Sequence, residues 1–368
     1  MTTSTLIFFM FGLAGLLVGG ELLVRGASRL AAAAGIPPLI VGLTVVAIGT
    51  SSPEIAVMAQ AAFGGQSELI IGNVVGSNIA NVLLILGLSA MAAPLIVPRR
   101  LIWLEVPLMI MVSVVMLLMA LNGRISRLEG VILLAGFLTH ILFMLREQRG
   151  AVQASQKEAQ ISKHNSKDWV RNVSLVIIGL VLLVIGSNWL VDAAVALARA
   201  LGVSELILGL TVIAVGTSLP ELATSIIAGL RGARDIAVGN IIGSNIFNIL
   251  AGLGLTALIA PGGVQVSQAA LRFDIPVMIA SAVACLPIFY IGHRISRWEG
   301  GLFVGYYVAY TIYLILTATR HHTASQFRIV MLWFVIPLTV VTLLIFVYRT
   351  ARAGSRQARS DPDASQAL

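Results

Sequence analysis

Two glutamates lie inside apolar stretches of the sequence, each at the end of the same short motif. The motif reads Ala47-Ile-Gly-Thr-Ser-Ser-Pro-Glu54 in the first half of the chain and Ala214-Val-Gly-Thr-Ser-Leu-Pro-Glu221 in the second. An ionisable side chain surrounded by hydrocarbon is costly, and it therefore indicates a functional role. The proline before each glutamate lacks an N–H and crowds the carbonyl four residues earlier, which predicts a broken helix with freed backbone oxygens. Breaks of this kind at membrane depth are typical of cation sites.

A second motif follows the first in each half. It reads Gly72-Asn-Val-Val-Gly-Ser-Asn-Ile-Ala-Asn81 and Gly239-Asn-Ile-Ile-Gly-Ser-Asn-Ile-Phe-Asn248. Its first asparagine, its serine and its last asparagine are four residues apart, so on a helix they form one polar stripe. Its two glycines have the spacing that lets helices approach closely. We therefore expect the stripes to lie near the two glutamates.

The candidate ligands are all oxygen atoms. They are the side chains of Glu54, Glu221, Thr50, Thr217, Ser51, Ser218, Ser77, Ser244, Asn81 and Asn248, with freed carbonyls around Ala47 and Ala214. Hard cations prefer such a set, and Ca2+ accepts about 6 to 8 oxygens in flexible geometry. Two glutamates carry a charge that one divalent ion balances, whereas monovalent ions must enter as a group. A site that cannot hold the divalent ion and the group of monovalent ions at the same time predicts antiport.

The composition is that of a polytopic membrane protein. Of the 368 residues, 58% are hydrophobic and 11% are charged, and the mean hydropathy is +0.96. Soluble proteins average about 25% charged residues. The formal net charge of +8 comes from lysines and arginines scattered between apolar runs, so it argues against a nucleic-acid partner.

Runs of about 20 apolar residues predict eleven transmembrane spans. They cover residues 5–24, 37–62, 69–93, 101–121, 128–146, 172–193, 204–230, 236–260, 272–291, 299–318 and 328–348. The longest connection, from 147 to 168, is rich in Gln, Ser and Lys and is interpreted as a solvated linker. The tail from 351 to 368 is polar.

An internal repeat organises the first ten spans. Residues 35–94 align with 202–261 without a gap, at an offset of 167 residues, and half of the aligned positions are identical. Each unit holds five spans, an odd number, so the second unit must cross the membrane in the opposite sense to the first. The predicted fold is an all-α polytopic membrane protein with an inverted repeat of two five-helix units and an eleventh C-terminal helix. The predicted parts are 1–146, a linker at 147–171, the second unit at 172–320, and an extra helix with a polar tail at 321–368.

The distribution of basic residues predicts the orientation. In the eleven-span arrangement, 18 of the 24 lysines and arginines fall on one side of the membrane, which includes the linker and the C-terminal tail. Cytoplasmic loops carry the excess of positive charge. We therefore expect the N-terminus outside, and the linker and the C-terminus in the cytoplasm.

The doubled motifs resemble the alpha repeats of the sodium/calcium exchanger family of the calcium/cation antiporter superfamily, in particular its compact prokaryotic members. The resemblance covers ten of the eleven spans. It implies Na+-driven Ca2+ exchange by alternating access in a prokaryotic inner membrane, with the two motif glutamates and Thr50, Ser51, Ser77, Asn81 and their counterparts as ligands. Some family members carry an aspartate at one of the positions equivalent to Asn81 and Asn248, whereas this chain has amides at both, which leaves the coupling ion and the stoichiometry open.

Three other functions are considered. The same fold coupled to H+ is the main alternative, because a buried glutamate without its cation can carry a proton. A passive cation channel is less consistent with a single-chain inverted repeat. An intramembrane enzyme has no zinc motif, nucleophile elbow or nucleotide loop to support it. The expected partners are Ca2+ and Na+ as transported ions and the lipid bilayer, with no cofactor, and the oligomeric state is left open.

Overall fold

The computed structural model describes residues 3–156, 166–200, 214–290, 292–319 and 340, and they form a helical bundle. Within these residues, eight helices are long and apolar enough to cross a membrane, and a bent pair of helices makes a possible ninth span. The predicted helical membrane fold is therefore confirmed. The predicted eleventh span at 328–348 lies outside the described residues except for residue 340, as does the first part of the span predicted at 204–230.

The first half of the chain contains five stretches of helix, some of which include π-helical segments, labelled η. Their bounds are α1 (Thr3–Ala34); α2 (Pro38–Val41), η1 (Gly42–Val46), α3 (Ala47–Thr50) and α4 (Ser52–Phe63); α5 (Ser67–Ile79), η2 (Ala80–Leu86) and α6 (Gly87–Ala92); η3 (Leu101–Glu105) and α7 (Val106–Ala120); and α8 (Arg127–Gln156).

The second half contains a similar series. Its bounds are α9 (Ser166–Ala200), α11 (Ala214–Gly216), α12 (Leu219–Leu230), α13 (Arg234–Phe247), η5 (Asn248–Leu253), α14 (Gly254–Ile259), η6 (Ala270–Asp274), α15 (Ile275–Tyr290) and α16 (Arg297–Ala318). α8 continues to Gln156 and α9 begins at Ser166, so described helices extend into both ends of the linker predicted at 147–171. Residues that favour helices, such as Glu, Gln and Ala, let a helix continue beyond its apolar part.

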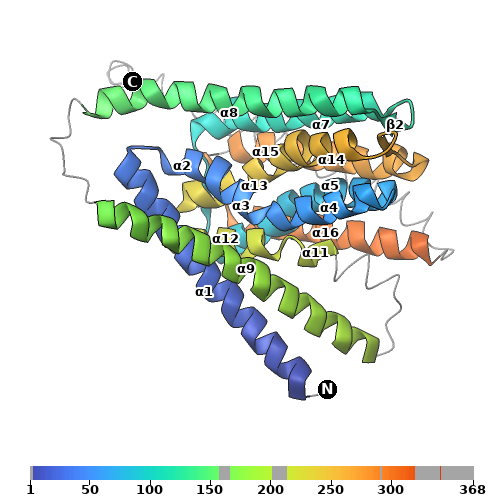
Figure 1. Ribbon diagram of the computed structural model, residues 1–368, viewed down its shortest axis with the longest axis horizontal. Helices are drawn as coiled ribbons and strands as arrows, with labels where there is room; N and C mark the ends of the chain where they lie inside the picture. Colours follow the sequence, from blue (N-terminus) through green and yellow to red (C-terminus); the bar gives the residue numbers. More distant parts are fainter. Residues whose placement is uncertain (1–2, 157–165, 201–213, 291, 320–339, 341–368) are drawn as a thin grey trace.

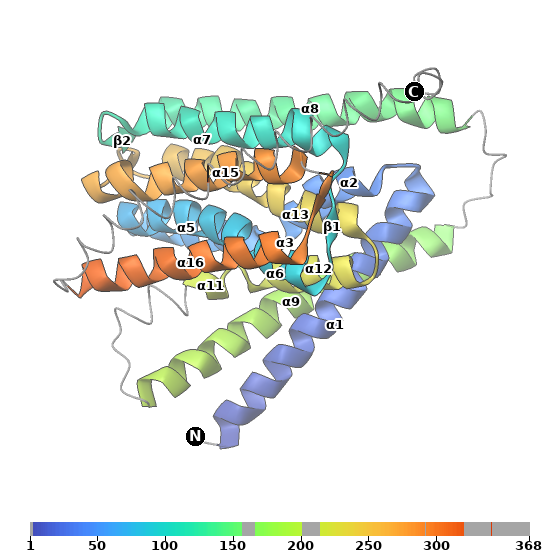
Figure 2. The ribbon, with the colours of Figure 1, turned by 180° about the vertical axis from the view of Figure 1, so that it is seen from behind.

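The helices that carry the second motif form the centre of the bundle. Every residue of α13 from Ile236 to Phe247 is buried, and α5 is the next most buried of the candidate spans in the described part of the chain. In both ribbon views, α7 and α8 run along one margin, α1 and α9 lie side by side at the opposite margin, and α5 and α13 lie between them (Figures 1 and 2). Large apolar side chains on the outer helices are exposed, such as Phe11, Leu138 and Val170, which is the surface that a lipid bilayer covers.

Helices α1 and α9 contact each other through glycines. A Cβ added at Gly12 would lie 2.8 Å from the carbonyl oxygen of Gly186, and a Cβ added at Gly19 would lie 2.8 Å from that of Gly179. Contacts this close to the backbone allow no side chain, so the glycines set the distance between the two helices.

Two short antiparallel ladders join the two halves of the chain. β1 (Leu95–Ile96) pairs with β4 (Arg294–Ile295), and β2 (Arg124–Ile125) pairs with β3 (Val264–Gln265). β2 and β4 each precede a repeated Ser-Arg-x-Glu sequence, whose serine caps the following helix and whose glutamate accepts hydrogen bonds from that serine. This capping box starts α8 and α16 at equivalent points.

Candidate cation-binding site

The helix carrying the first motif is broken where the sequence predicts it. α3 ends at Thr50, α4 begins at Ser52, and the two segments meet at an angle of 44°. Pro53 lies in the first turn of α4, where a missing N–H costs no helical hydrogen bond. In the second copy of this motif α11 ends at Gly216 and α12 begins at Leu219, so both predicted breaks are confirmed.

The breaks do not free the carbonyl of Ala47, and that expectation is wrong. This oxygen accepts a hydrogen bond from the backbone N–H of Ser51 at 3.0 Å, and the Thr50 hydroxyl oxygen lies 3.4 Å from it. The helical pattern continues as far as Ser51, because Pro53 lacks only its own N–H, whose helical acceptor would be the carbonyl of Gly49 rather than that of Ala47. At Ala214 the structure describes the backbone conformation but not the side chain.

Each glutamate accepts a hydrogen bond from the motif of the other half. The Ser51 hydroxyl donates to Oε1 of Glu221 at 2.7 Å, and the Ser218 hydroxyl donates to Oε1 of Glu54 at 3.2 Å. Both carboxylates are buried, with 1% and 0% of Glu54 and Glu221 exposed. The two motifs, separated by 167 residues in the sequence, are thus brought into one site.

Several oxygens of this site are buried and accept no hydrogen bond from the residues that the structure describes. They are Oε2 of Glu54, Oε2 of Glu221, Oγ of Ser244, Oδ1 of Asn81 and Oδ1 of Asn248. A buried polar atom without a partner is expensive, and an ion supplies what such an atom lacks. All five belong to the predicted ligand set, so the donor atoms fit a hard cation.

A chain of hydrogen bonds connects the first motif to α13 and α12. The Thr50 hydroxyl donates to Oδ1 of Asn240 at 3.1 Å, and Nδ2 of Asn240 donates to the Ser225 hydroxyl at 3.0 Å. Ser225 and its neighbour Thr224 are fully buried one turn after Glu221. The positions equivalent to Ser225 and Thr224 in the first unit are Met58 and Val57, so this series of hydrogen bonds has no counterpart there.

Asparagines of the two second motifs bind one another across the centre of the bundle. Nδ2 of Asn81 donates to Oδ1 of Asn245 at 3.0 Å, and Nδ2 of Asn248 donates to Oδ1 of Asn78 at 3.3 Å. Nδ2 of Asn248 also donates to the Ser77 hydroxyl at 3.1 Å. The spacing of four residues that selected the polar stripe excluded Asn78 and Asn245. Their presence at one place in both repeats was the available sign of a role.

The remaining members of the predicted set differ in their contacts. Ser77 donates to the carbonyl of Asn73 at 2.7 Å, and Ser244 is fully buried. Thr217 is half-buried in the turn between α11 and α12. No group of three or more His, Cys, Asp or Glu side chains occurs among the described residues. The two glutamates are therefore accompanied by neutral oxygens rather than by further charged ligands.

Helical spans broken at two glutamates, with buried oxygens directed at no protein donor in the described residues, define the class of secondary ion transporters. The sequence matches the family described as sodium/calcium exchanger protein over residues 4–146 and 172–316, and the chain belongs to this family. Its members are transporters rather than enzymes.

Individual relatives agree with this membership. The chain is 31% identical to the sodium/calcium exchanger MaX1 of Methanosarcina acetivorans over 350 residues, covering 85% of this chain and 99% of MaX1. It is 42% identical to the inner membrane protein YrbG of Escherichia coli K12 over 281 residues, covering 73% of this chain and 85% of YrbG. A solved structure of the sodium-calcium exchanger NCX_Mj superimposes with a TM-score of 0.71 at 32% identity, covering 84% of this chain and 98% of that one.

Proposed function

We propose that the protein exchanges Ca2+ for Na+ across the membrane by alternating access. The observation that carries this proposal is the reciprocal pair of hydroxyl–glutamate hydrogen bonds, which leaves one oxygen of each carboxylate buried without a donor in the described part of the chain. The names of MaX1 and NCX_Mj as sodium/calcium exchangers support the choice of ions.

The ions bind between Glu54 and Glu221, and the neutral oxygens complete the coordination. The ligands are the carboxylates, the hydroxyls and amide oxygens of the two motifs, and the second lone pair of the Ala47 and Ala214 carbonyls: Glu54, Glu221, Thr50, Thr217, Ser51, Ser218, Ser77, Ser244, Asn81, Asn248, Ala47 and Ala214. Two negative charges balance one Ca2+ or a group of Na+ ions. An empty site leaves two like charges buried, which disfavours the transition of the unloaded protein between its two access states. This penalty couples the two ion movements.

The two halves form an inverted repeat of five-helix units. Reciprocal contacts support this arrangement, because an offset of 167 residues converts the Ser51–Glu221 hydrogen bond into the Ser218–Glu54 hydrogen bond. The same offset converts the contact of Gly12 with Gly186 into that of Gly179 with Gly19. Contacts that exchange in this way are those of a pseudo-two-fold axis, and the odd number of predicted spans per unit puts this axis in the membrane plane.

The units extend over residues 1–146 and 172–320, with a cytoplasmic connection between them. The N-terminus lies outside and the C-terminus lies in the cytoplasm, as the distribution of basic residues indicates. The location is a prokaryotic inner membrane, which the name of the Escherichia coli relative supports. The extra span and polar tail predicted at 321–368 lie outside the residues that the structure describes, apart from residue 340.

Calcium uptake into vesicles containing the purified protein tests the function. With Na+ inside, Ca2+ outside, constant pH and clamped voltage, we expect Ca2+ uptake that stops when the Na+ gradient is removed. Calcium flux driven by a proton gradient in Na+-free buffer, with none from a Na+ gradient, would replace this proposal with H+ coupling. Flux that runs only down the Ca2+ gradient, with no response to Na+ or H+, would indicate a channel.

A further inference from the structure

The hydrogen bonds of Asn78 and Asn245, which sequence analysis did not select, orient the amides of the proposed ligands Asn81 and Asn248. An asparagine side chain presents either an oxygen or an NH2 group toward a given point, and only the oxygen can bind a cation. The NH2 group of Asn81 is held by Asn245, and that of Asn248 is held by Asn78 and Ser77. The oxygen of each amide is thereby turned away from these partners, and it is buried without a donor in the described residues.

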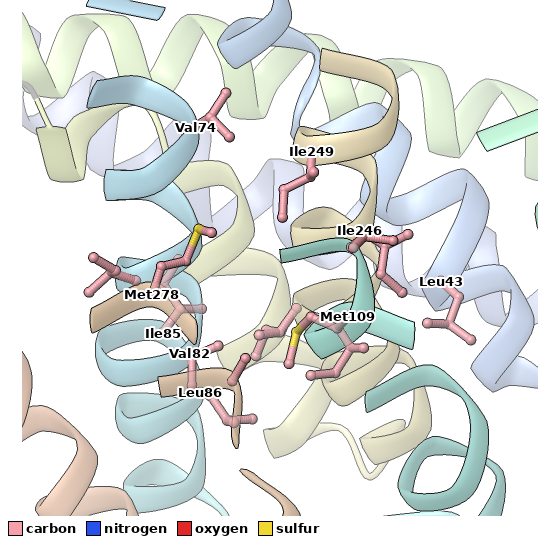
Figure 3. Close-up of a cluster of buried hydrophobic side chains, with 14 of the residues drawn as sticks. Leu43, Val74, Val82, Ile85, Leu86, Met109, Ile246, Ile249 and Met278 are labelled. Carbon is pink, nitrogen blue, oxygen red and sulfur yellow. The ribbon is translucent and has the colours of Figure 1, made fainter. Parts of the chain in front are cut away.

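Asn78 and Asn245 are themselves fixed on their other side. Nδ2 of Asn78 donates to the backbone oxygen of Asn245 at 3.4 Å and lies 3.6 Å from the sulfur of Met278, while Nδ2 of Asn245 lies 3.3 Å from the sulfur of Met109. Both methionines belong to the buried hydrophobic cluster drawn in Figure 3. Because their NH2 groups are committed to these contacts, Asn78 and Asn245 offer their oxygens to the ligand asparagines.

The arrangement brings the freed amide oxygens near the carboxylates. η2, which contains Asn81, contacts α12, which carries Glu221; η5, which contains Asn248, contacts α4, which carries Glu54. Both asparagines lie at the start of a π-helical segment, a widening that is frequent at functional sites. Each unit therefore supplies the ligand amide, and the opposite unit supplies the group that orients it.

We propose that Asn78 and Asn245 are positioning residues that make Asn81 and Asn248 present oxygen rather than NH2 to the transported cation. This inference rests on the proposed function. It gives a physical reason why neutral amides serve at both positions. An aspartate has two equivalent oxygens and needs no such orientation, whereas an asparagine in the wrong orientation directs a donor at the ion.

The test is a comparison in two backgrounds. In the otherwise wild-type protein, Asn245→Leu removes the acceptor from Asn81, and we expect binding of radioactive Ca2+ to weaken by about 10- to 100-fold, the usual effect of losing a group that orients a metal ligand. In the Asn81→Asp background the same substitution should change Ca2+ affinity by less than about twofold, because the carboxylate does not need orienting and the two effects are then not additive.

The second arm uses the other half of the molecule. Asn78→Leu should weaken Ca2+ binding less than Asn245→Leu, because Asn248 keeps its hydrogen bond to Ser77. Its effect should also disappear in the Asn248→Asp background. Thr256→Val serves as the control, since the Thr256 hydroxyl is equally buried but donates only to backbone oxygens of its own helical stretch.

Each outcome decides between the alternatives. If the wild-type protein binds Ca2+ and exchanges it, but Asn245→Leu binds Ca2+ normally, the positioning role is wrong. Equal losses in the wild-type and Asn81→Asp backgrounds would show that Asn245 acts by packing, and would overturn the proposal as well. If the wild-type protein performs no exchange although it binds Ca2+, the proposed function fails, while the affinity comparison still tests the orientation of the amides.

Discussion

At the scale of single residues, the two glutamates depend on each other's helices. Ser51 precedes Glu54 by three residues but donates its hydrogen bond to Glu221, and Ser218 does the reverse. A movement that separates α4 from α12 breaks both hydrogen bonds together. In the proposed site the two carboxylates would therefore respond as a pair to an ion bound between them, as an exchanger with one shared site requires.

Removal of one carboxylate should abolish exchange. Glu54→Gln and Glu221→Gln should each lower the rate of Ca2+ uptake by at least about 30-fold, because losing one partner of a buried charged contact costs about 2–5 kcal/mol and each 1.36 kcal/mol is a factor of ten. Vesicle uptake measures the effect. Glu68→Gln, at an exposed position on α5, should behave like the wild type. Normal uptake by either site variant would contradict the paired-carboxylate site.

Removing the hydroxyl of Ser51 or Ser218 should impair exchange less than removing one of the carboxylates. Ser51→Ala removes a hydrogen bond to a carboxylate, a contact worth about 1.5–3 kcal/mol, so we expect the KM for Ca2+ to rise by at least about tenfold. Ser218→Ala should have a smaller effect, because its hydrogen bond is longer, at 3.2 Å against 2.7 Å. A KM that is unchanged in both variants, measured by uptake at varied Ca2+, would argue that the hydroxyls only fill space.

The hydrogen-bond chain that is specific to the second unit should affect one ion more than the other. Ser225→Ala removes the acceptor from Asn240, which in turn accepts the Thr50 hydroxyl, so the loss of one neutral hydrogen bond should change the Na+ concentration for half-maximal exchange by about fivefold. Ser281→Ala, whose hydroxyl donates to the carbonyl of Val277 in its own helix, is the control. Parallel shifts in the Na+ and Ca2+ dependences would indicate a general disturbance of the site instead.

At the scale of the elements, the apolar runs predicted most of the membrane helices, and the prolines of the first motif predicted both breaks. The predictions succeeded there because the length of a span and the backbone chemistry of proline are local properties. They failed at the Ala47 carbonyl, and they missed Asn78 and Asn245. Asn78 and Asn245 lie three residues before Asn81 and Asn248, outside the spacing of four that defined the stripe, and their role depends on hydrogen bonds to the other half of the chain that no local spacing contains.

The break at the first motif should be necessary for transport. Pro53→Ala restores an N–H and removes the ring that crowds the preceding turn, so α3 and α4 should tend toward one continuous helix. We expect Ca2+ uptake to fall by more than about tenfold, since misplacing binding groups by about 1 Å costs up to about 100-fold. Pro287→Ala, inside α15, is the matched substitution away from the motifs. Uptake equal to that of the wild type would mean that the bend does not depend on the proline.

The glycine contact between α1 and α9 should tolerate no side chain. Gly19→Ala would bring its Cβ within 2.8 Å of backbone atoms of Gly179 and Leu183, so the helices must separate at a cost of about 1–3 kcal/mol. The melting temperature in detergent should fall, and exchange should decrease with it. Gly305→Ala, on α16 where no described atom lies within 4 Å, should leave the melting temperature unchanged or raise it slightly. A Gly19→Ala variant as stable as Gly305→Ala would contradict the close contact.

At the scale of the whole molecule, the joining of the two halves is distributed rather than confined to the site. Four kinds of contact each connect one half with the other in the described residues. They are the serine–glutamate hydrogen bonds, the asparagine pairs, the α1–α9 glycine contacts and the two short ladders. Sequence comparison within the chain could predict that two similar units exist. It could not predict these pairings, because each depends on atoms that lie far apart in the sequence and meet only in the folded protein.

The segment after the repeat should be dispensable for exchange. All proposed ligands lie before residue 249, and α16, which packs against α6 and η2 of the first half, ends at Ala318, so a protein that ends at residue 321 keeps the complete site and these described contacts. We expect it to take up Ca2+ against Na+ with the KM of the full chain. The melting temperature of both forms, measured in the same detergent, separates lost function from lost folding. A truncated protein that melts like the full chain but performs no exchange would make residues 322–368 part of the transporting unit, whereas a lower melting temperature with an unchanged KM would assign them to stability.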